Sequence, residues 1–299
     1  MQISKIYAGI VTFNPEIIRL KQNIDAISPQ LKEVVLFDNG SKNIEQIKKL
    51  LEEYSNVLLI EARKNKGIAA ALNLLMKWGY DKEYQWMLSL DQDSVCQEDF
   101  VKEMNKYLTI EKRLGIVAPV IKDRNVGIIG HNPVKKIQHV NTCITSGAFS
   151  NLKAWKQIGG YDERMFIDSV DFEYCYRMRK NKYGVIQVRD VQLLHEIGTS
   201  EKRRFLFWNV VVNGHSAFRK FYIAQNNVYY PLKHRLWLHF IRGNFRNLGL
   251  IFTVMLYEDN KKDKLSAIIK GWGKAYQIKG ERNYADQFHS SSNGKFWRD

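Results

Sequence analysis

Apolar segments alternate with segments of helical periodicity along the first 95 residues, and this alternation is the strongest constraint on the fold. The strand-like segments are 3–13, 34–37, 57–60 and 86–90, and two of the helical segments are 44–54 and 67–78. A further helix is expected after the first strand, with Asn14 as its N-cap and Pro15 at its first position. This order predicts an α/β fold with a mostly parallel sheet flanked by helices.

Polar side chains lie at the ends of three of the four strands. They are Thr12 and Asn14 at the end of the first strand, Asp38 after the second, and Asp91 and Asp93 after the fourth. Sheets of this kind bind ligands in the crevice at the carboxyl ends of their strands. We therefore expect these side chains to lie together at a binding site.

Asp91 and Asp93 are two residues apart, so their carboxylates face the same side if the strand continues through both. Two adjacent carboxylates repel each other unless a cation neutralises them. Mg²⁺ and Mn²⁺ prefer oxygen ligands and commonly bridge carboxylates to phosphates. The pair therefore indicates a divalent-metal site, although the same pattern also occurs in surface turns.

Two loops carry further candidates for ligand contacts. Asp38 can accept hydrogen bonds from a base or a ribose hydroxyl, or it can form an Asx-turn with the residues that follow. Residues 65–73 begin as a loop and continue as a helix. Gly67 permits close approach of the backbone, and free N–H groups near Asn65 suit an anion or a hydroxyl, as well as an ordinary helix start.

The second half of the sequence predicts strands at 116–121, 137–145 and 185–194, and a helix at 170–180. Asp168, Asp171 and Glu173 lie at or before the start of that helix, where its dipole stabilises acidic side chains. A general base could also be one of them. His195 at the end of the last strand could ligate a metal or contact phosphate, or be structural. Arg203 and Arg204 could hold a diphosphate.

The chain carries a net charge of +15, concentrated toward the C-terminus. Residues 201–299 hold 18 Lys/Arg against 7 Asp/Glu, a net +11, which leaves +4 for the first 200 residues. This balance indicates a phosphorylated substrate, an anionic membrane surface or nucleic acid as partner, unless it is a solvated face. Residues 232–256 mix large apolar residues with four Lys or Arg, as in helices at anionic membranes; packing on the catalytic domain or dimerisation is the alternative.

The cysteines and the N-terminus bear on compartment. Cys96, Cys143 and Cys175 are odd in number and widely spaced, so we expect buried thiols rather than disulfides or a zinc cluster. The first residues lack the features of a signal peptide, and the longest apolar stretches are too short to span a bilayer. We expect a cytoplasmic protein at the inner face of the cell membrane.

Six segments taken in order resemble the inverting family 2 glycosyltransferases with the GT-A fold, and most closely the bacterial rhamnosyltransferases among them. The segments are 11–15, 38–41, 65–73, 91–93, 145–149 and 159–173, and the resemblance runs from Ile6 to about Ser200. The segment 159–173, with Gly159-Gly160-Tyr161-Asp162-Glu163, is the most specific of them and indicates the rhamnosyl subgroup.

The resemblance implies a role for each matching residue. Thr12, Asn14 and Asp38 would hold the base and ribose, and Asn65 and Gly67 would lie near the ribose and diphosphate. Asp91 would contact the ribose or a Mg²⁺ or Mn²⁺ ion, which Asp93 and His195 would also hold, and Ser146, Gly147 and Asp168 would line the acceptor side. Asp171 matches the catalytic base of the family, with Asp168 as second choice because Val170 stands where the family has Glu.

The resemblance further implies transfer of L-rhamnose from dTDP-β-L-rhamnose to a cell-surface polysaccharide or lipid-linked glycan. A UDP-hexose or UDP-galactofuranose donor remains an alternative. A nucleic-acid-binding protein, for which no recognised module is found, and a non-catalytic glycan-binding protein are alternatives of another class. The expected organisation is a GT-A catalytic domain at 1–200, with the donor side at 1–95 and the acceptor side at 96–200, then a basic helical region at 201–285 and a flexible tail at 286–299.

Overall fold

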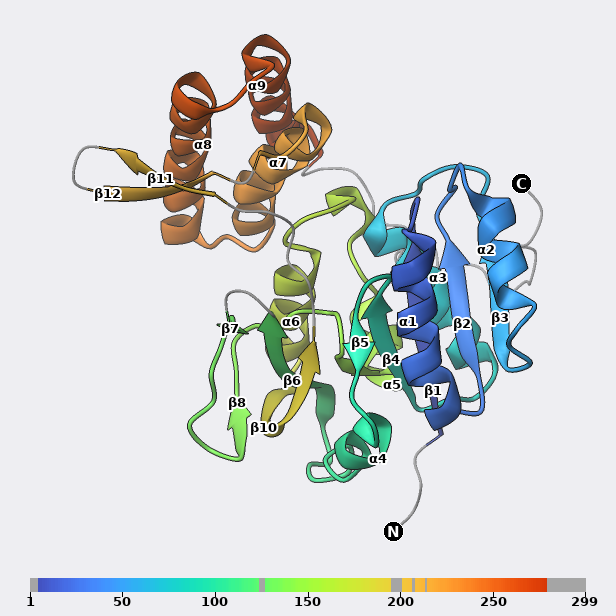
Figure 1. Ribbon diagram of the computed structural model, residues 1–299. Helices are drawn as coiled ribbons and strands as arrows, with labels where there is room; N and C mark the ends of the chain where they lie inside the picture. Colours follow the sequence, from blue (N-terminus) through green and yellow to red (C-terminus); the bar gives the residue numbers. More distant parts are fainter. Residues whose placement is uncertain (1–4, 124–126, 195–200, 206–207, 213, 279–299) are drawn as a thin grey trace. The chain divides into compact units, whose positions relative to one another are not determined.

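The computed structural model describes residues 5–123, 127–194, 201–205, 208–212 and 214–278, which form two compact units (Figure 1). The N-terminal unit comprises residues 1–162 and 171–196, and the C-terminal unit comprises residues 163–170 and 197–299. The short segment 163–170 therefore clusters with the C-terminal part of the chain. The sequence prediction had placed it within the first 200 residues.

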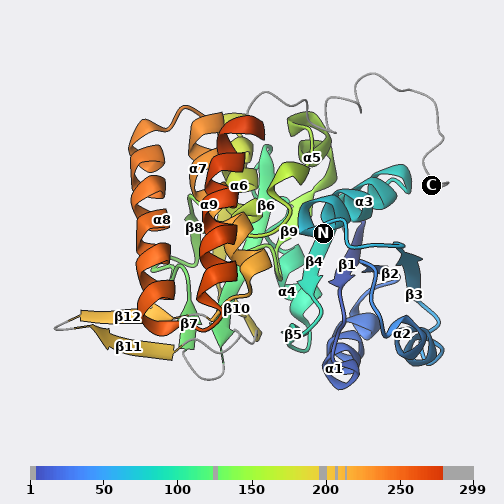
Figure 2. The same cartoon turned by 90° about the horizontal axis from the view of Figure 1, so that it is seen from above.

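The first half of the N-terminal unit is a parallel sheet of four strands in the order β3-β2-β1-β4. The strands are β1 (Ile6–Thr12), β2 (Val34–Asp38), β3 (Val57–Glu61) and β4 (Trp86–Asp91). Every residue of β1 and β2 is buried, because helices cover both faces of a parallel sheet. Figure 2 shows α1 (Ile17–Ile27) and α2 (Ile44–Leu51) on one face and α3 (Ile68–Asp81) on the other.

The same sheet continues beyond β4 with strands of mixed direction, in the order β9-β6-β10-β5. β9 is antiparallel to both β4 and β6, whereas β10 is parallel to β6. The strands are β5 (Val95–Cys96), β6 (Leu114–Asp123), β9 (Phe149–Asn151) and β10 (Gly184–Leu194), with β7 (Gly127–Ile129) and β8 (Ile137–His139) at the side. The helices are α4 (Phe100–Asn105), α5 (Leu152–Ile158) and α6 (Val170–Lys180), and the 3₁₀ turns are η1 (Ser28–Gln30) and, in the C-terminal unit, η2 (Glu163–Met165).

The C-terminal unit contains an antiparallel hairpin, β11 (Glu201–Phe205) and β12 (Trp208–Val212), and three helices. The helices are α7 (Ala217–Lys233), α8 (Trp237–Tyr257) and α9 (Lys261–Gln277). Glycines let them approach closely: a Cβ atom at Gly243 of α8 would lie 1.9 Å from the carbonyl oxygen of Asn227 on α7. A Cβ atom at Gly271 of α9 would lie 2.0 Å from that of Phe221.

A buried cluster of charges ties the same three helices together. Glu258, just after α8, accepts from Lys220 Nζ of α7 at 2.5 Å and from Lys264 Nζ of α9 at 2.9 Å. All three residues are buried. The attraction compensates for the loss of hydration only while all three are present.

The predicted α/β fold with a helical C-terminal region is confirmed, but three local predictions were wrong. The first helix begins at Ile17, and its N-cap position is Glu16 instead of Asn14. The strand expected at 137–145 ends at His139. The hairpin β11–β12 occupies the start of the region expected to be wholly helical.

Candidate active site

The carboxyl ends of the parallel strands bring the predicted nucleotide-binding residues to one edge of the sheet. Thr12 lies opposite Asp38 across β1 and β2, and Val11 lies opposite Asp91 across β1 and β4. The register thus places three of the predicted residues on neighbouring strand ends. The loops that follow complete the arrangement.

Asp38 is buried and organises the loop after β2. Its Oδ1 accepts from Thr12 Oγ1 at 3.2 Å, and its Oδ2 accepts from the backbone N–H groups of Gly40 and Ser41 at 3.1 and 2.9 Å. Gly40 has φ of 84°, and a Cβ there would lie 2.8 Å from the backbone of Lys64. The Asx-turn is therefore present, and nucleotide binding by Asp38 stays a prediction.

Asn14 joins the loops after β1 and β2 instead of capping a helix. It has φ of 48°, its N–H donates to Ser41 Oγ at 2.8 Å, and its Oδ1 accepts from the N–H of Lys42 at 2.8 Å. The left-handed conformation, which asparagine tolerates better than most residues, turns the chain toward the neighbouring loop. The two loops are thereby fixed together at the strand ends.

Asn39, which the sequence analysis did not select, connects the loop after β2 to the loop before α3. Its Nδ2 donates to Asn65 Oδ1 at 3.0 Å, and its Oδ1 accepts from the N–H of Lys66 at 2.8 Å. Asn65 Oδ1 also accepts from the N–H of Gly67 at 2.8 Å. The predicted residues Asn65 and Gly67 thus belong to the same network as Asp38.

The Asp91-Gln92-Asp93 segment forms a turn between β4 and β5, so the argument from strand periodicity does not apply to Asp93. Gln92 Oε1 accepts from the N–H of Phe13 at 2.9 Å, which attaches the turn to the end of β1. Asn23 of α1, a buried residue not found from sequence, donates from Nδ2 to the carbonyl oxygen of Asp91 at 2.5 Å. Both aspartates remain partly exposed.

The fit of a divalent metal depends on the donor chemistry of this turn. Asp91 and Asp93 offer carboxylate oxygens next to the predicted nucleotide site, which is the donor type that Mg²⁺ and Mn²⁺ prefer. Within the described part of the chain no group of three or more His, Cys, Asp or Glu is placed to hold a metal ion. The residues present fit a divalent ion to the extent that Asp91 and Asp93 would supply it with carboxylate oxygens.

The segment 145–148 contacts both the Asp91-Gln92-Asp93 turn and the surroundings of Asp171. Ser146 is buried, and its Oγ accepts from the N–H of Asp91 at 3.1 Å and lies 2.7 Å from Ser94 Oγ. Gly147 has φ of 77°, and a Cβ there would lie 2.8 Å from Leu193. Thr145, one residue before Ser146, lines the pocket beside Asp171. Ser146 and Gly147 are thus structural supports next to the site, and acceptor binding by them stays a prediction.

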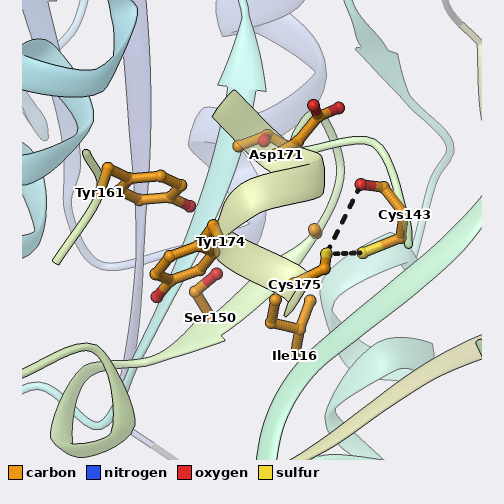
Figure 3. A pocket seen from close by; sticks show the side chains of 9 residues that line it. Ile116, Cys143, Ser150, Tyr161, Asp171, Tyr174 and Cys175 are labelled. Atoms are coloured by element: carbon orange, nitrogen blue, oxygen red, sulfur yellow. Dashed lines mark hydrogen bonds between the residues drawn. The ribbon is translucent and has the colours of Figure 1, made fainter. Parts of the chain in front are cut away.

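Asp171 lies in the first turn of α6 at a small pocket (Figure 3). Tyr174 and Cys175, one turn further along α6, also line the pocket, and the ring of Tyr174 stacks on Tyr161 with centroids 3.9 Å apart. The Sγ atoms of Cys143 and Cys175 are 3.7 Å apart. The contact with Cys175 and burial raise the pKa of the Cys143 thiol well above its usual value, so it stays protonated near neutral pH. The prediction of three buried free thiols is confirmed.

Two buried polar groups anchor the elements around Asp171. Asn73 of α3 accepts from the N–H of Tyr161 at 2.7 Å and donates to its carbonyl oxygen at 3.0 Å. Glu173, on α6, accepts from Arg177 at 2.7 Å. Burial lowers the pKa of Arg177, but the charge of Glu173 and its hydrogen bond together outweigh burial, so the net shift is upward. Glu173 is therefore committed to Arg177, which removes it from the candidate bases.

Asp168, the second choice for the base, lies in the C-terminal unit. Both its carboxylate oxygens accept from Arg219 of α7, with Oδ1 to Nη2 at 2.8 Å and Oδ2 to Nε at 3.1 Å. This hydrogen bond raises the pKa of Arg219, so the guanidinium stays charged. Both carboxylate oxygens of Asp168 are thus occupied by the guanidinium, and Asp171 stays the first choice for the base.

Three predicted residues cannot be assessed at the level of side chains. His195 lies outside the described residues. Arg203 and Arg204 lie on β11, opposite Val210 and Asn209 of β12, but only their backbone is described. Their roles toward metal and diphosphate stay predictions.

A mixed sheet with polar loops at the ends of its parallel strands, a partly exposed pair of aspartates and a separate acidic residue defines a class, the glycosyltransferases of GT-A fold. The sequence model described as Glycosyl transferase family 2 matches residues 8–170, more than half of the chain, and the protein belongs to this family. The dTDP-rhamnosyl transferase RfbF of Shigella flexneri is 30% identical over 244 residues, which are 75% of this chain and 78% of that protein.

Solved structures show the same fold at low sequence identity. TarS 1-349 of S. aureus in complex with UDP-GlcNAc is 15% identical with a TM-score of 0.57, over 95% of this chain and 83% of that one. Its UDP complex aligns over 65% of this chain and 61% of that one, with 15% identity and a TM-score of 0.50. The mannosyltransferase PcManGT of Pyrobaculum calidifontis, in complex with GDP-Man and Mn²⁺, is 14% identical with a TM-score of 0.55, over 96% and 78%.

Proposed function

We propose that this enzyme transfers L-rhamnose from dTDP-β-L-rhamnose to a hydroxyl of a cell-surface polysaccharide or lipid-linked glycan. The observation that carries the proposal is the hydrogen-bonded set of loops at one sheet edge, which joins Thr12, Asp38 and Asn65. The 30% identity to a dTDP-rhamnosyl transferase supports rhamnose and dTDP as the donor components. Thr12, Asn14 and Asp38 are proposed to hold the base and ribose, and Asn65 and Gly67 to lie beside the diphosphate.

The proposed reaction is one displacement at the anomeric carbon. The acceptor oxygen forms the new bond as the bond to the diphosphate breaks on the opposite face, and the carboxylate of Asp171 takes the acceptor proton. A single displacement inverts the configuration, so a β-linked donor gives an α-L-rhamnoside. dTDP leaves with the bonding electron pair.

A Mg²⁺ or Mn²⁺ ion is proposed at Asp91 and Asp93, with His195 as a further ligand. A bound divalent ion offsets the negative charge that grows on a leaving diphosphate. Arg203 and Arg204 are proposed to add positive charge near the same group. Mn²⁺ together with GDP-Man in PcManGT supports a divalent ion in this fold.

We expect dTDP with Mg²⁺ or Mn²⁺ to raise the melting temperature, and dTDP-L-rhamnose to raise it more than UDP-glucose, UDP-galactofuranose or GDP-mannose. A ligand at 100 times its Kd stabilises the folded state by about 2.7 kcal/mol, which thermal-shift measurements resolve. EDTA and the variant Asp93→Asn should remove most of the shift. The control is Asp99→Asn, an exposed acid after the same turn. If a UDP-sugar raised the melting temperature more than dTDP-L-rhamnose, the proposed donor would be wrong. If EDTA left the shift unchanged, the proposed metal site would be wrong.

Contact with an anionic lipid surface is proposed for α8, in keeping with a lipid-linked acceptor. Six apolar residues at spacings of three and four form the α8 stripe, with exposed fractions between 44% and 71%: Leu238, Ile241, Phe245, Leu248, Phe252 and Met255. Arg242 and Arg246 are exposed on the same helix, which contains no acidic residue. None of the described helices is long and apolar enough to cross a bilayer.

Charge favours lipid over a second copy of the chain as the partner of the α8 stripe. Two α8 helices packed on each other would bring only arginines to the borders of the contact, with no acidic partner on either helix. An anionic lipid surface complements the arginines and receives the apolar side chains. The helix is about 31 Å long at 1.5 Å per residue, enough to lie along such a surface.

We expect the protein to float with vesicles that contain 30% phosphatidylglycerol at low salt, and not with pure phosphatidylcholine vesicles. The double variant Phe245→Ser and Phe252→Ser should lose flotation. The matched control is Val134→Ser, which changes an apolar residue that is 82% exposed in the N-terminal unit. Equal flotation of wild type and double variant would contradict the proposal. If analytical ultracentrifugation shows a dimer of the wild type and a monomer of the double variant, the α8 stripe binds a second copy of the chain instead.

A further inference from the structure

The segment that directly precedes the proposed base has an unusual backbone. Phe166, Asp168 and Ser169 have φ of 48°, 66° and 59°, in the left-handed region that residues with side chains rarely adopt. Such conformations persist where the surroundings fix them, and they concentrate at functional sites. Residues 163–170, which contain all three, belong to the C-terminal unit.

Asn226 of α7 holds this segment by its backbone. Asn226 is buried, and its Nδ2 lies 2.9, 2.8 and 2.8 Å from the carbonyl oxygens of Met165, Ile167 and Asp168, which share its two N–H groups. Its Oδ1 accepts from Gln225 Nε2 at 3.1 Å. One side chain therefore binds three carbonyl groups before and within the stretch of positive-φ residues.

Two other side chains of α7 hold the same segment. Arg219 binds both carboxylate oxygens of Asp168, as described above. Tyr222 stacks on the ring of Phe166 with centroids 4.8 Å apart and the planes 12° from parallel. Backbone, charged and aromatic groups of 163–170 thus all find partners on one helix.

Residues 163–170 lead directly into the helix that carries Asp171, without an intervening loop. Helix α6 begins at Val170, and Asp171 is its second residue. Because peptide units are rigid, the conformation of Asp168 and Ser169 sets where α6 begins and how its first turn is directed. A change at these residues is therefore transmitted to Asp171 across two or three residues of the main chain.

We propose that Asn226 and Arg219 are positioning residues, which hold 163–170 so that the carboxylate of Asp171 meets the acceptor hydroxyl. This inference rests on the proposed role of Asp171. A base displaced by about 1 Å can cost on the order of 100-fold in rate.

The variant Asn226→Asp tests the proposal, because it keeps the Oδ1 that accepts from Gln225 and removes the two N–H donors. In this variant the backbone amides of residues 163–172 should exchange hydrogen at least about 10-fold faster than in the wild type. Mass spectrometry measures this exchange. The variant's kcat for dTDP release, measured with dTDP-L-rhamnose and an array of synthetic lipid-diphosphate-linked sugars, should fall about 10- to 100-fold with an unchanged donor KM. The matched control is Asn227→Ala, which removes a hydrogen bond of 3.0 Å from the next residue of α7 to Asn247.

The outcomes separate a failure of this inference from a failure of the proposed base. Wild-type exchange or wild-type kcat in Asn226→Asp overturns the inference, because the residue is then not a positioning residue. Normal turnover of Asp171→Asn in the same assay overturns the proposed base as well. If Asn226→Asp does not fold, Arg219→Gln at the partly exposed end of the contact takes its place, with the same two readouts.

Discussion

Asp171→Asn is expected to lower kcat for rhamnosyl transfer about 10²- to 10⁴-fold while the Kd for dTDP stays the same. Asparagine keeps the size of the side chain and its place at the start of α6, but it cannot accept the proton of the acceptor hydroxyl. The loss corresponds to about 3–5 kcal/mol of transition-state stabilisation. The donor contacts lie in other loops, which is why binding should persist. Steady-state kinetics and calorimetry with dTDP measure the two quantities.

Asp168→Asn is the comparison for that substitution, because the two acids are three residues apart in the same acidic segment. It weakens the contact with Arg219, so it should lower kcat only as far as a displaced base does, by about 10- to 100-fold, and less than Asp171→Asn does. The reverse order of the two effects would make Asp168 the base. Near-normal turnover of both variants would remove this segment from the chemistry.

The second large effect is expected at the buried charges of the C-terminal unit. Glu258→Gln should lower the free energy of unfolding by about 3–5 kcal/mol, because Lys220 and Lys264 would keep buried charges without their carboxylate. The change in the free energy of unfolding is measured by urea denaturation, with hydrogen exchange of the amides in α7, α8 and α9 as the readout. The control is Asp81→Asn, which breaks an exposed ion pair with Lys77 and should cost less than about 1 kcal/mol.

The same carboxylate gives this unit an acid-sensitive stability. Burial alone would raise the pKa of Glu258, but its hydrogen bonds to the two lysines outweigh burial and lower the pKa below its ordinary value of 4.5. A lowered pKa in the folded state stabilises the protein fully above the unfolded value, and this stability is lost as pH falls through the folded value. Glu258→Gln should lack this loss below about pH 4.5, and an identical acid limb in both proteins would contradict the assignment.

The parallel half of the sheet was predictable because its signals are local. Apolar strands such as 34–37 are buried on both faces, and the polar residue after each strand falls at the ligand edge by the geometry of the sheet. The approximate positions of Thr12, Asp38 and Asp91 follow from that rule. The family resemblance supplied the roles.

Other features depend on contacts between distant segments, which the sequence pattern does not contain. Asn14 precedes a proline, as helix caps often do, but its side chain instead accepts from the N–H of Lys42. Asn23 and Asn39 look like ordinary polar residues, yet they are buried and bind the loops of the site together. The position of Asn23 on the apolar face of α1, with Leu20 and Ile24, is a local signal that could have indicated its burial.

The association of 163–170 with α7 was also beyond a local reading. The segment is acidic and lies before a helix, which predicts dipole stabilisation as readily as catalysis. The hydrogen bonds from Asn226 join residues about 60 positions apart in the sequence. The residues with positive φ are not glycines, so the sequence does not indicate this backbone conformation. The resemblance favours Asp171 over Asp168 as the base, and the contact of Arg219 with both oxygens of Asp168 supports that proposal.

The account is tested most directly by the anomeric configuration of the product formed from dTDP-β-L-rhamnose and the synthetic lipid-diphosphate-linked acceptors. The measurement is the one-bond C1–H1 coupling constant of the transferred sugar in the NMR spectrum of the isolated product. An α-L-rhamnoside, formed by wild type and lost in Asp171→Asn, is the predicted result. A β-linked product, or transfer from a UDP-sugar but not from dTDP-L-rhamnose, would contradict it.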